Sequence, residues 1–478
     1  MAFAPAFTQA LGLIVIPILT RLYSPDAFGG YAVLASICDP FLAFVTMSYA
    51  MAIMLPDNEK EVGSLICVCL FFSLLVSAAL GLLVLLVRGG IIEIKMTQGV
   101  GNYLWLLPIS IFLSGLSITL RYWNLRKRRF GNVSLSNMAE YTTNNALTLA
   151  AGCFGYASVL SLFLGSLLGL IVKVVVMTHG ILVFNLQLIR SSFKKANLLA
   201  VTRRYKKFPI YVLWTDVVSR FSLQVPIYFL SSYFSQTLVG YYSLGLRLLT
   251  MPVSLIGNSI GEVYFQREAQ KKSSDGSLLT NLFERLVASG TFFFVLLALI
   301  GRDLFGFVFG AQWAEAGTYA QILSFSIYVR FITIPASYLT VIWEKQNVSL
   351  ILRISEITLS LLAVIIGGVL RNEYVSLGLL SFLIGFLYAL ISFWVMRMGG
   401  LSLRDVSRIL LKYLSLSIPL VGSILASRLI FHGSGPIIMI GSFIMLCLYI
   451  FVLIRDKQIQ QSFLEIIRVK YPSFKTSL

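Results

Sequence analysis

Residues 63–87 read GSLICVCLFFSLLVSAALGLLVLLV, a stretch without a single charged side chain. A helix needs about 20 predominantly apolar residues to cross the hydrocarbon core of a bilayer, so this stretch alone predicts a transmembrane helix. Comparable runs recur along all 478 residues, of which 58% are hydrophobic and only 12% charged, with a mean hydropathy of +0.86. Soluble domains carry roughly 25% charged residues. The composition therefore predicts an all-α integral membrane protein.

The apolar runs divide the chain into about fourteen predicted transmembrane helices, and twelve is the alternative count. The fifth span is the most polar, because it contains Glu140 and several Thr and Asn side chains. Polar groups inside a membrane helix need partners on neighbouring helices or in a cavity. The predicted spans are approximately 2–20, 30–53, 63–87, 102–122, 139–157, 159–178, 208–232, 239–262, 281–301, 318–342, 350–370, 375–396, 408–430 and 436–454.

The chain has 38 Lys and Arg residues against 20 Asp and Glu, a formal net charge of +18 that a nucleic-acid-binding protein could also show. The distribution of the basic residues indicates a different cause. With the N-terminus on the cytoplasmic side, most of them fall in cytoplasmic loops or helix flanks and few in outside loops, as the positive-inside rule requires. The sequence therefore predicts a multi-pass protein with both termini cytoplasmic and no nucleic-acid partner.

Residues 187–207 differ from the other loops because they mix apolar side chains with a dense basic set. This composition is typical of an amphipathic helix on an anionic membrane surface. An internal repeat supports a division of the chain here: residues 23–31 and 234–242 share Tyr/Phe, Ser, Phe/Val, Gly and Tyr at a constant offset of 211, as in transporters built from two parallel halves. The predicted domains are an N-terminal lobe (1–186), a basic amphipathic cytoplasmic linker (187–207), a C-terminal lobe (208–398), and two additional helices with a cytoplasmic tail (399–478).

The N-terminal sequence resembles that of a known family. Residues 19–25 read LTRLYSP, residues 28–32 read FGGYA, and a short inner loop at residues 55–61 reads LPDNEKE. This pattern resembles the polysaccharide transporter branch of the multidrug/oligosaccharidyl-lipid/polysaccharide exporter superfamily, the O-antigen flippases of the Wzx type. Length, span count and the basic linker extend the resemblance over the whole chain, while the C-terminal half matches only in layout.

The resemblance implies two six-helix lobes in a V around a central cavity, with two peripheral C-terminal helices. It implies that the protein moves an undecaprenyl-diphosphate-linked oligosaccharide, an O-antigen or other surface polysaccharide repeat unit, from the inner to the outer leaflet of the bacterial cytoplasmic membrane by alternating access. Its place would then be in lipopolysaccharide biosynthesis. The expected partners are this lipid-linked glycan, membrane lipid, and polysaccharide polymerase and chain-length proteins.

Four charged residues lie well inside predicted spans: Asp216, Arg220, Arg247 and Arg330. A charge at the centre of a membrane helix costs about 2.5 to 3.5 kcal/mol on insertion scales, so such residues usually face a polar cavity or a partner. The guanidinium fork of arginine offers bidentate hydrogen bonds to phosphate. We therefore expect the three arginines to form a cationic patch that binds the anionic head of the substrate, with Asp216 beside them.

Asp216 and Arg220 are four residues apart, a spacing that favours an ion pair on one helical face. The pair is either a structural salt bridge or a switch in which protonation of Asp216 releases the arginine. Asp39 precedes Pro40, which bends a helix, so this acid is a second candidate for binding a cation or a proton. The remaining candidates for the cavity or for coupling are Glu140, Lys173 and Arg21.

Sequence motifs for catalysis are absent. The chain contains no G-x-x-x-x-G-K-[ST] phosphate loop and no H-E-x-x-H zinc motif. We therefore predict a transporter rather than an enzyme, with no cofactor and no metal site, and with an H+ or Na+ gradient as the candidate driving force. Another transporter of the same fold is the main alternative: a peptidoglycan-precursor flippase, an exopolysaccharide or teichuronic acid exporter, or a cation-coupled drug antiporter. A membrane glycosyltransferase or polymerase is the alternative from a different class.

Overall fold

The computed structural model of the protein describes residues 3–91, 93, 99–179, 195–254, 276–343, 345–419 and 421–424. All regular elements within these ranges are helical, so the predicted all-α fold is confirmed. Contacts divide the chain into two compact units, Met1–Gly240 and Tyr241–Leu478. The span predicted at 436–454, the tail and the first part of the linker lie outside the described residues.

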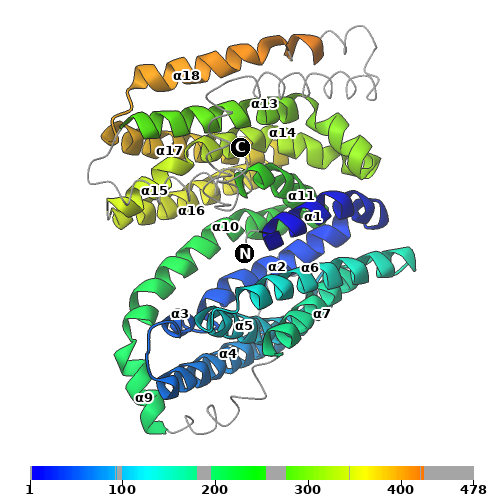
Figure 1. Ribbon diagram of the computed structural model, residues 1–478. Helices are drawn as coiled ribbons and strands as arrows, with labels where there is room; N and C mark the ends of the chain where they lie inside the picture. The colour runs from blue at the N-terminus through cyan, green and yellow to red at the C-terminus, as the bar shows by residue number, and fades with distance from the viewer. Residues whose placement is uncertain are drawn as a thin grey trace, which may run out of the picture. The chain divides into compact units, whose positions relative to one another are not determined.

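The first unit is a bundle of long helices (Figure 1). Three of them begin after a residue whose side chain accepts a hydrogen bond from a backbone amide of the first turn: Ser24 before α2, Asn58 before α4 and Ser158 before α7. The elements are α1 (Phe3–Leu22), α2 (Pro25–Phe44), α3 (Tyr49–Ala52), α4 (Glu59–Arg88), the 3-10 helix η2 (Gly101–Tyr103), α5 (Leu106–Arg126), α6 (Phe130–Cys153), α7 (Val159–Thr178), α9 (Lys195–Arg204), the π-helix η3 (Phe208–Val212), α10 (Leu213–Tyr233) and the first turn of α11 (Gln236–Pro252).

Small residues let α6 and α7 lie against each other. A Cβ atom on Gly165 would come within 2.5 Å of Thr148, and one on Gly169 would come within 3.3 Å of the Asn144 side chain. The close approach buries part of the polar face of α6, where Asn145 is 8% exposed, and this side chain donates to a carbonyl of its own helix. The polarity of the fifth predicted span is thus satisfied in part by the helix itself and by its neighbour.

The second predicted span, residues 30–53, is broken rather than only bent. Helix α2 ends at Phe44, and the one-turn helix α3 resumes at Tyr49. Between them Met47 and Ser48 have φ angles of 47° and 59°, in the left-handed region that residues other than glycine seldom adopt. The break lies a few residues beyond the bend expected at Pro40.

The Pro40 position is stabilised by α10. Proline lacks the amide hydrogen that would bond to the carbonyl of Ser36, one helical turn earlier. Tyr228 of α10 supplies the missing donor, because its hydroxyl donates to the Ser36 carbonyl oxygen at 2.6 Å. The proline therefore ties α2 to a helix nearly two hundred residues away in the sequence.

The two segments of the internal repeat contact each other where α2 and α11 begin. A Cβ atom on Gly29 would collide with the carbonyl of Gln236, and one on Gly240 would collide with the carbonyl of Pro25. Gly29 and Gly240 are 211 residues apart, and so are Pro25 and Gln236. The two contacts are therefore equivalent, as a two-fold relation between the segments requires, and glycine permits the backbones to approach this closely.

The second unit has the same all-helical character. Its helix α14 is bent by 45° against α15 at Thr333, so the tenth predicted span is a bent one. Pro335 in the first turn of α15 accounts for the bend, and the Thr333 hydroxyl donates to the Val329 carbonyl at 2.8 Å. The elements are the remainder of α11, α13 (Gly276–Phe309), the 3-10 helix η5 (Ala311–Trp313), α14 (Ala314–Ile332), α15 (Ile334–Ile342), α16 (Gln346–Val369), α17 (Glu373–Met398) and α18 (Leu403–Leu416).

Within the described residues, eight helices are long and apolar enough to cross a membrane, or nine if the bent pair of α14 and α15 forms one span. Each of the first thirteen predicted spans overlaps a described helix. The total of fourteen spans, or twelve, stays a prediction.

Candidate functional site

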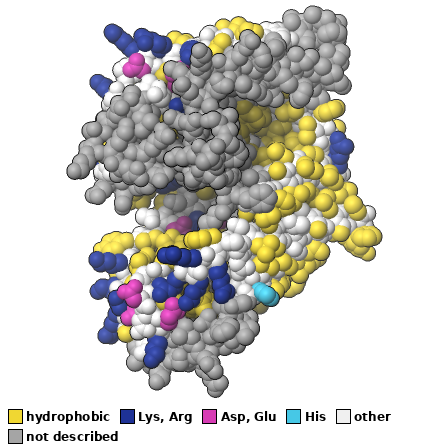
Figure 2. All heavy atoms as spheres, in the orientation of Figure 1, with side chains coloured by type: hydrophobic (Ala, Val, Ile, Leu, Met, Phe, Trp, Pro, Cys, Tyr) yellow, Lys and Arg dark blue, Asp and Glu magenta, His cyan; other side chains and the backbone are white. Residues whose placement is uncertain are grey.

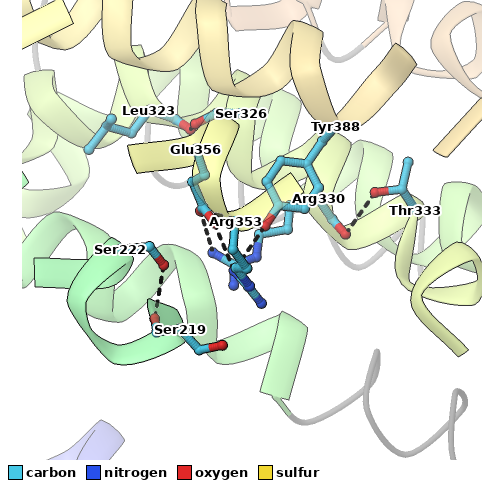
Figure 3. A network of polar contacts seen from close by, with 9 residues as sticks. All are labelled: Ser219, Ser222, Leu323, Ser326, Arg330, Thr333, Arg353, Glu356 and Tyr388. Atoms are coloured by element: carbon cyan, nitrogen blue, oxygen red, sulfur yellow. Dashed lines mark hydrogen bonds and ion pairs between the residues drawn. The ribbon is translucent and has the colours of Figure 1, made fainter. Parts of the chain in front are cut away.

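A cluster of two arginines, a glutamate and a tyrosine lies inside the second unit (Figure 3). Arg353 of α16 donates from Nη1 to the Glu356 carboxylate at 2.7 Å, and Nη1 of Arg330 on α14 lies 4.0 Å from the other oxygen of that carboxylate. The ring of Tyr388 on α17 stacks against Arg330, with 5.5 Å between the ring centroid and the guanidinium carbon. Nη1 of Arg353 also donates a hydrogen bond to the Tyr388 hydroxyl oxygen at 3.3 Å. We refer to these four residues as the arginine cluster.

Glu356 is the buried centre of the arginine cluster. Its side chain is 7% exposed, whereas those of Arg330 and Arg353 are 31% and 30% exposed. A buried carboxylate is costly without partners, so its charge holds both guanidinium groups in place. The local sequence favours this arrangement, because Arg353 and Glu356 are three residues apart on one face of α16 and Arg330 lies in the last turn of α14, where a cation is stabilised by the helix dipole.

The arginine cluster carries a surplus of positive charge, since two guanidinium groups face a single carboxylate among the described residues. Each guanidinium has five N–H donors in a planar fork, and the contacts with Glu356 and Tyr388 use only part of them. Because both arginines are about one third exposed, donors remain accessible from outside the cluster. The arrangement suits an anion with several acceptor oxygens, such as a phosphate or diphosphate.

A second cluster, which we call the acidic cluster, lies in the first unit. Arg220 of α10 donates from Nε to Asp216 at 3.1 Å and from Nη1 to Asp39 of α2 at 3.0 Å. Gln224 donates to the second oxygen of Asp39 at 3.1 Å. Asp216, Arg220, Gln224 and Tyr228 follow one another at intervals of four residues, so they form one polar stripe on the face of α10 that contacts α2.

The acidic cluster has the opposite charge balance. Two carboxylates face one guanidinium among the described residues, so Arg220 already has two anionic partners. Its contacts place Arg220 in the first unit, while Arg247 and Arg330 belong to the second. The salt bridge expected between Asp216 and Arg220 is present, and the structure adds Asp39 to it.

The other candidates predicted from sequence occupy separate places. Arg247 is exposed on α11, and no ion pair of its side chain is found among the described residues. Lys173 of α7 forms an ion pair with Glu140 of α6 at 2.7 Å. Arg21 is exposed in the last turn of α1. In the described ranges no group of three or more His, Cys, Asp or Glu side chains is arranged to hold a metal ion.

Sequence reasoning missed Arg353, Glu356 and Gln224. Arg353 lies near the start of the predicted span 350–370, where a basic side chain is typical of the flank of a cytoplasmic loop. The signal that could have found it is the spacing from Arg353 to Glu356, an ion pair one turn apart inside an apolar run, the same signal that drew attention to Asp216 and Arg220.

Each unit also contains a cavity with an almost wholly apolar lining. The cavity of the first unit, about 520 Å³, lies between α2, α4 and α10 and is lined by Pro40 and Phe221 among others. That of the second unit, about 510 Å³, lies between α13, α14, α17 and α18. Val329 and Ala389 line the second cavity, whereas their neighbours in sequence, Arg330 and Tyr388, belong to the arginine cluster.

Among the described residues, long apolar helices able to cross a membrane define an all-helical membrane protein. Comparison with known families gives a finer assignment. Residues 18–318 match the model of the family described as polysaccharide biosynthesis protein, and the chain belongs to this family. The resemblance read from residues 19–32 and 55–61 is thereby confirmed.

Solved structures share the fold at low sequence identity. The lipid II flippase MurJ in its inward closed conformation matches with a TM-score of 0.75 at 15% identity, over 95% of this chain and 98% of that one. An inward-facing multidrug resistance MATE family transporter of the MOP superfamily matches with a TM-score of 0.60 at 12% identity, over 83% of this chain and 94% of that one. No curated protein matches the chain.

Proposed function

We propose that this protein is a flippase for a lipid-linked oligosaccharide. Its substrate would be an undecaprenyl-diphosphate-linked repeat unit of an O-antigen or other surface polysaccharide, which it moves from the inner to the outer leaflet of the bacterial cytoplasmic membrane by alternating access. The observation that carries the proposal is the arginine cluster inside a chain of the polysaccharide biosynthesis family.

The physical requirement for such a substrate is a set of cationic donors inside the membrane. A diphosphate must cross roughly 30 Å of hydrocarbon, where it has lost the water that solvates it. Arg330 and Arg353 provide forked donors for its oxygens, and Glu356 offsets part of their charge while the site is empty. In this proposal the arginine cluster takes the role that sequence reasoning gave jointly to Arg220, Arg247 and Arg330.

A second candidate function is the export of a peptidoglycan precursor, which the fold similarity to a lipid II flippase favours. Both substrates would present a diphosphate to the arginine cluster and differ in the attached glycan. We propose a transporter and not an enzyme in either case, with both termini on the cytoplasmic side. For a polysaccharide repeat unit, the proposed partners that receive the product are polysaccharide polymerase and chain-length proteins.

The proposal is tested with purified protein in vesicles that contain a labelled undecaprenyl-diphosphate oligosaccharide in both leaflets. An enzyme added outside removes the glycan label from the outer leaflet, so flipping converts a protected half of the label into an accessible one. We expect complete release with the protein and half release without it. Half release in the presence of folded protein would contradict the flippase proposal, and equal release of a lipid II analogue would favour the second candidate.

Ion coupling is proposed for the acidic cluster of the first unit. With two carboxylates and one guanidinium, the uptake of one proton or one Na+ would bring the cluster to neutrality. We expect Asp216→Asn to make transport insensitive to an imposed pH or Na+ gradient, because the amide cannot take up a proton or hold a cation by charge. The measurement compares transport rates with and without each gradient, and Asp303→Asn in α13, outside the cluster, is the control. An unchanged response to both gradients in Asp216→Asn would remove Asp216 from the coupling.

A further inference from the structure

One end of the first unit is strongly basic. It consists of three segments: the start of α4 with the residues that precede it, the turn between α5 and α6, and the end of α9 with the residues that follow it. Ion pairs join the start of α4 to each of the other two segments. We call this surface the basic end. Its described side chains are the basic Lys60, Arg126, Lys127, Arg128, Arg129, Arg203, Arg204, Lys206 and Lys207 and the acidic Asp57, Glu59 and Glu61.

Helix α9 packs with one face on the protein core at this end. Val201 and Tyr205 are 4% and 8% exposed and pack in one cluster with residues of α3, α4, α5, α6 and α7. The hydroxyl of Tyr49 on α3 also donates to the Thr202 carbonyl at 3.3 Å. Leu198, Val201 and Tyr205 thus face the protein, whereas Leu199 of α9 is 49% exposed. The interfacial position expected for residues 187–207 stays a prediction.

The acids of the basic end are engaged in internal ion pairs. Glu59 contacts Lys127 at 2.9 Å and Arg126 at 3.7 Å, and Glu61 contacts Arg204 at 2.8 Å. Five exposed cations have no carboxylate within 4 Å among the described side chains: Lys60, Arg128, Arg203, Lys206 and Lys207. The surface is thus held together by its own acids and presents its surplus charge outward.

Large apolar side chains are exposed next to these cations. Phe130 follows the turn between α5 and α6 and is 45% exposed, while Tyr211 and Trp214, just after the basic residues that follow α9, are 67% and 58% exposed. Figure 2 shows Lys and Arg side chains gathered on this part of the molecule beside hydrophobic ones. Aromatic side chains beside a row of cations are typical of a protein surface at the level of the lipid headgroups.

We propose that the basic end binds the headgroups of anionic phospholipids in the inner leaflet. The five exposed cations contact the phosphates, and the aromatic side chains lie at the boundary between the headgroups and the acyl chains. Binding is mainly electrostatic, because Leu198 and Val201 of α9 pack against the protein and Leu199 is the one large apolar side chain that the described part of α9 leaves exposed. A nucleic acid or an acidic protein would match the charge but would leave the exposed aromatic side chains without a partner. This inference is independent of the transported substrate.

The test measures thermal unfolding of the full-length protein in neutral detergent with added phosphatidylglycerol or phosphatidylcholine. We expect phosphatidylglycerol to raise the Tm of the native protein more than phosphatidylcholine does, and 0.5 M salt to remove the difference, because added salt screens exposed charges. In Arg203→Gln/Lys206→Gln the apparent affinity for phosphatidylglycerol should fall by about 30-fold, since each cation near an anionic surface contributes about a fivefold factor.

The matched control is Arg88→Gln/Arg371→Gln, which removes the same charge from two exposed arginines on the predicted outer side. This variant should keep the native response to phosphatidylglycerol. Free glycerol phosphate added in place of lipid should raise the Tm of the native protein less than phosphatidylglycerol does, because it leaves the aromatic side chains without a partner. If both double variants lost the same amount of affinity for phosphatidylglycerol, the effect would depend on the net charge of the protein alone, and the proposal would be overturned. An undiminished phosphatidylglycerol response in Arg203→Gln/Lys206→Gln and in Arg128→Gln would overturn it as well.

Discussion

Arg353→Ala should reduce transport of a diphosphate-linked lipid by roughly 10- to 100-fold, because a hydrogen bond to a charged group contributes about 1.5 to 3 kcal/mol. The variant also leaves the buried Glu356 with Arg330, 4.0 Å away, as its remaining cationic partner. Removing one partner of a buried ion pair costs about 3 to 5 kcal/mol of stability where no other partner remains, and the cost is smaller here because Arg330 stays close to Glu356. Loss of transport in Arg353→Ala alone therefore mixes a binding effect with a folding effect.

The double variant Arg353→Ala/Glu356→Gln separates the two effects. Neutralising Glu356 removes the unpaired charge, so the thermal stability should return toward the native value while transport stays low. Arg353→Lys should transport better than Arg353→Ala but less well than the native protein, because an ammonium group provides charge without the fork. The readouts are vesicle transport and Tm in detergent. Recovery of transport in the double variant would mean that Arg353 serves only to neutralise Glu356.

The same experiment on Arg302 is the matched control. Arg302 of α13 also pairs with a glutamate of the second unit, Glu315, at 3.4 Å, but its side chain is 61% exposed. Arg302→Ala should change both transport and stability little, since an exposed ion pair contributes about 0 to 1 kcal/mol. Equal transport defects in Arg302→Ala and Arg353→Ala would show that the assay responds to any lost arginine of this unit.

Most of the helices could be predicted from the sequence, because a membrane helix requires about 20 consecutive, mostly apolar residues whatever its neighbours are. The interruptions were harder. Pro40 and Pro335 signal a bend, but the chain breaks at Met47 and Ser48, which carry no such signal. Left-handed backbone at these two residues depends on their tertiary surroundings rather than on residue type.

The candidate site was predicted in parts. Asp216 and Arg220 could be paired by their spacing, and Asp39 could be recognised as an acid within a span, but nothing local links α2 to α10 across 181 residues. The charge balance of a cluster depends on such distant contacts. Arg220 was therefore expected to be a cation available to substrate, and the structure shows it between two carboxylates.

The second large effect is expected at the contact between the two repeat segments. Gly29→Ala and Gly240→Ala should each destabilise the protein by about 3 kcal/mol or more, because the added methyl group meets backbone atoms that cannot rotate away. The measurement is the Tm in detergent together with the amount of protein in the membrane. Gly101→Ala is the control, since a Cβ atom at that position would have no neighbour within 4 Å.

The reciprocal geometry makes a sharper prediction for the double variant. Once a methyl group on Gly29 has pushed the start of α2 away from the Gln236 carbonyl, the Pro25 carbonyl also moves away from Gly240. The second methyl group then meets less resistance, so the destabilisation in Gly29→Ala/Gly240→Ala should be clearly smaller than the sum of the two single effects. Two unrelated glycines would give additive effects instead. Strict additivity would therefore show that the two contacts are independent, and that the two-fold relation between the repeat segments does not govern how they pack.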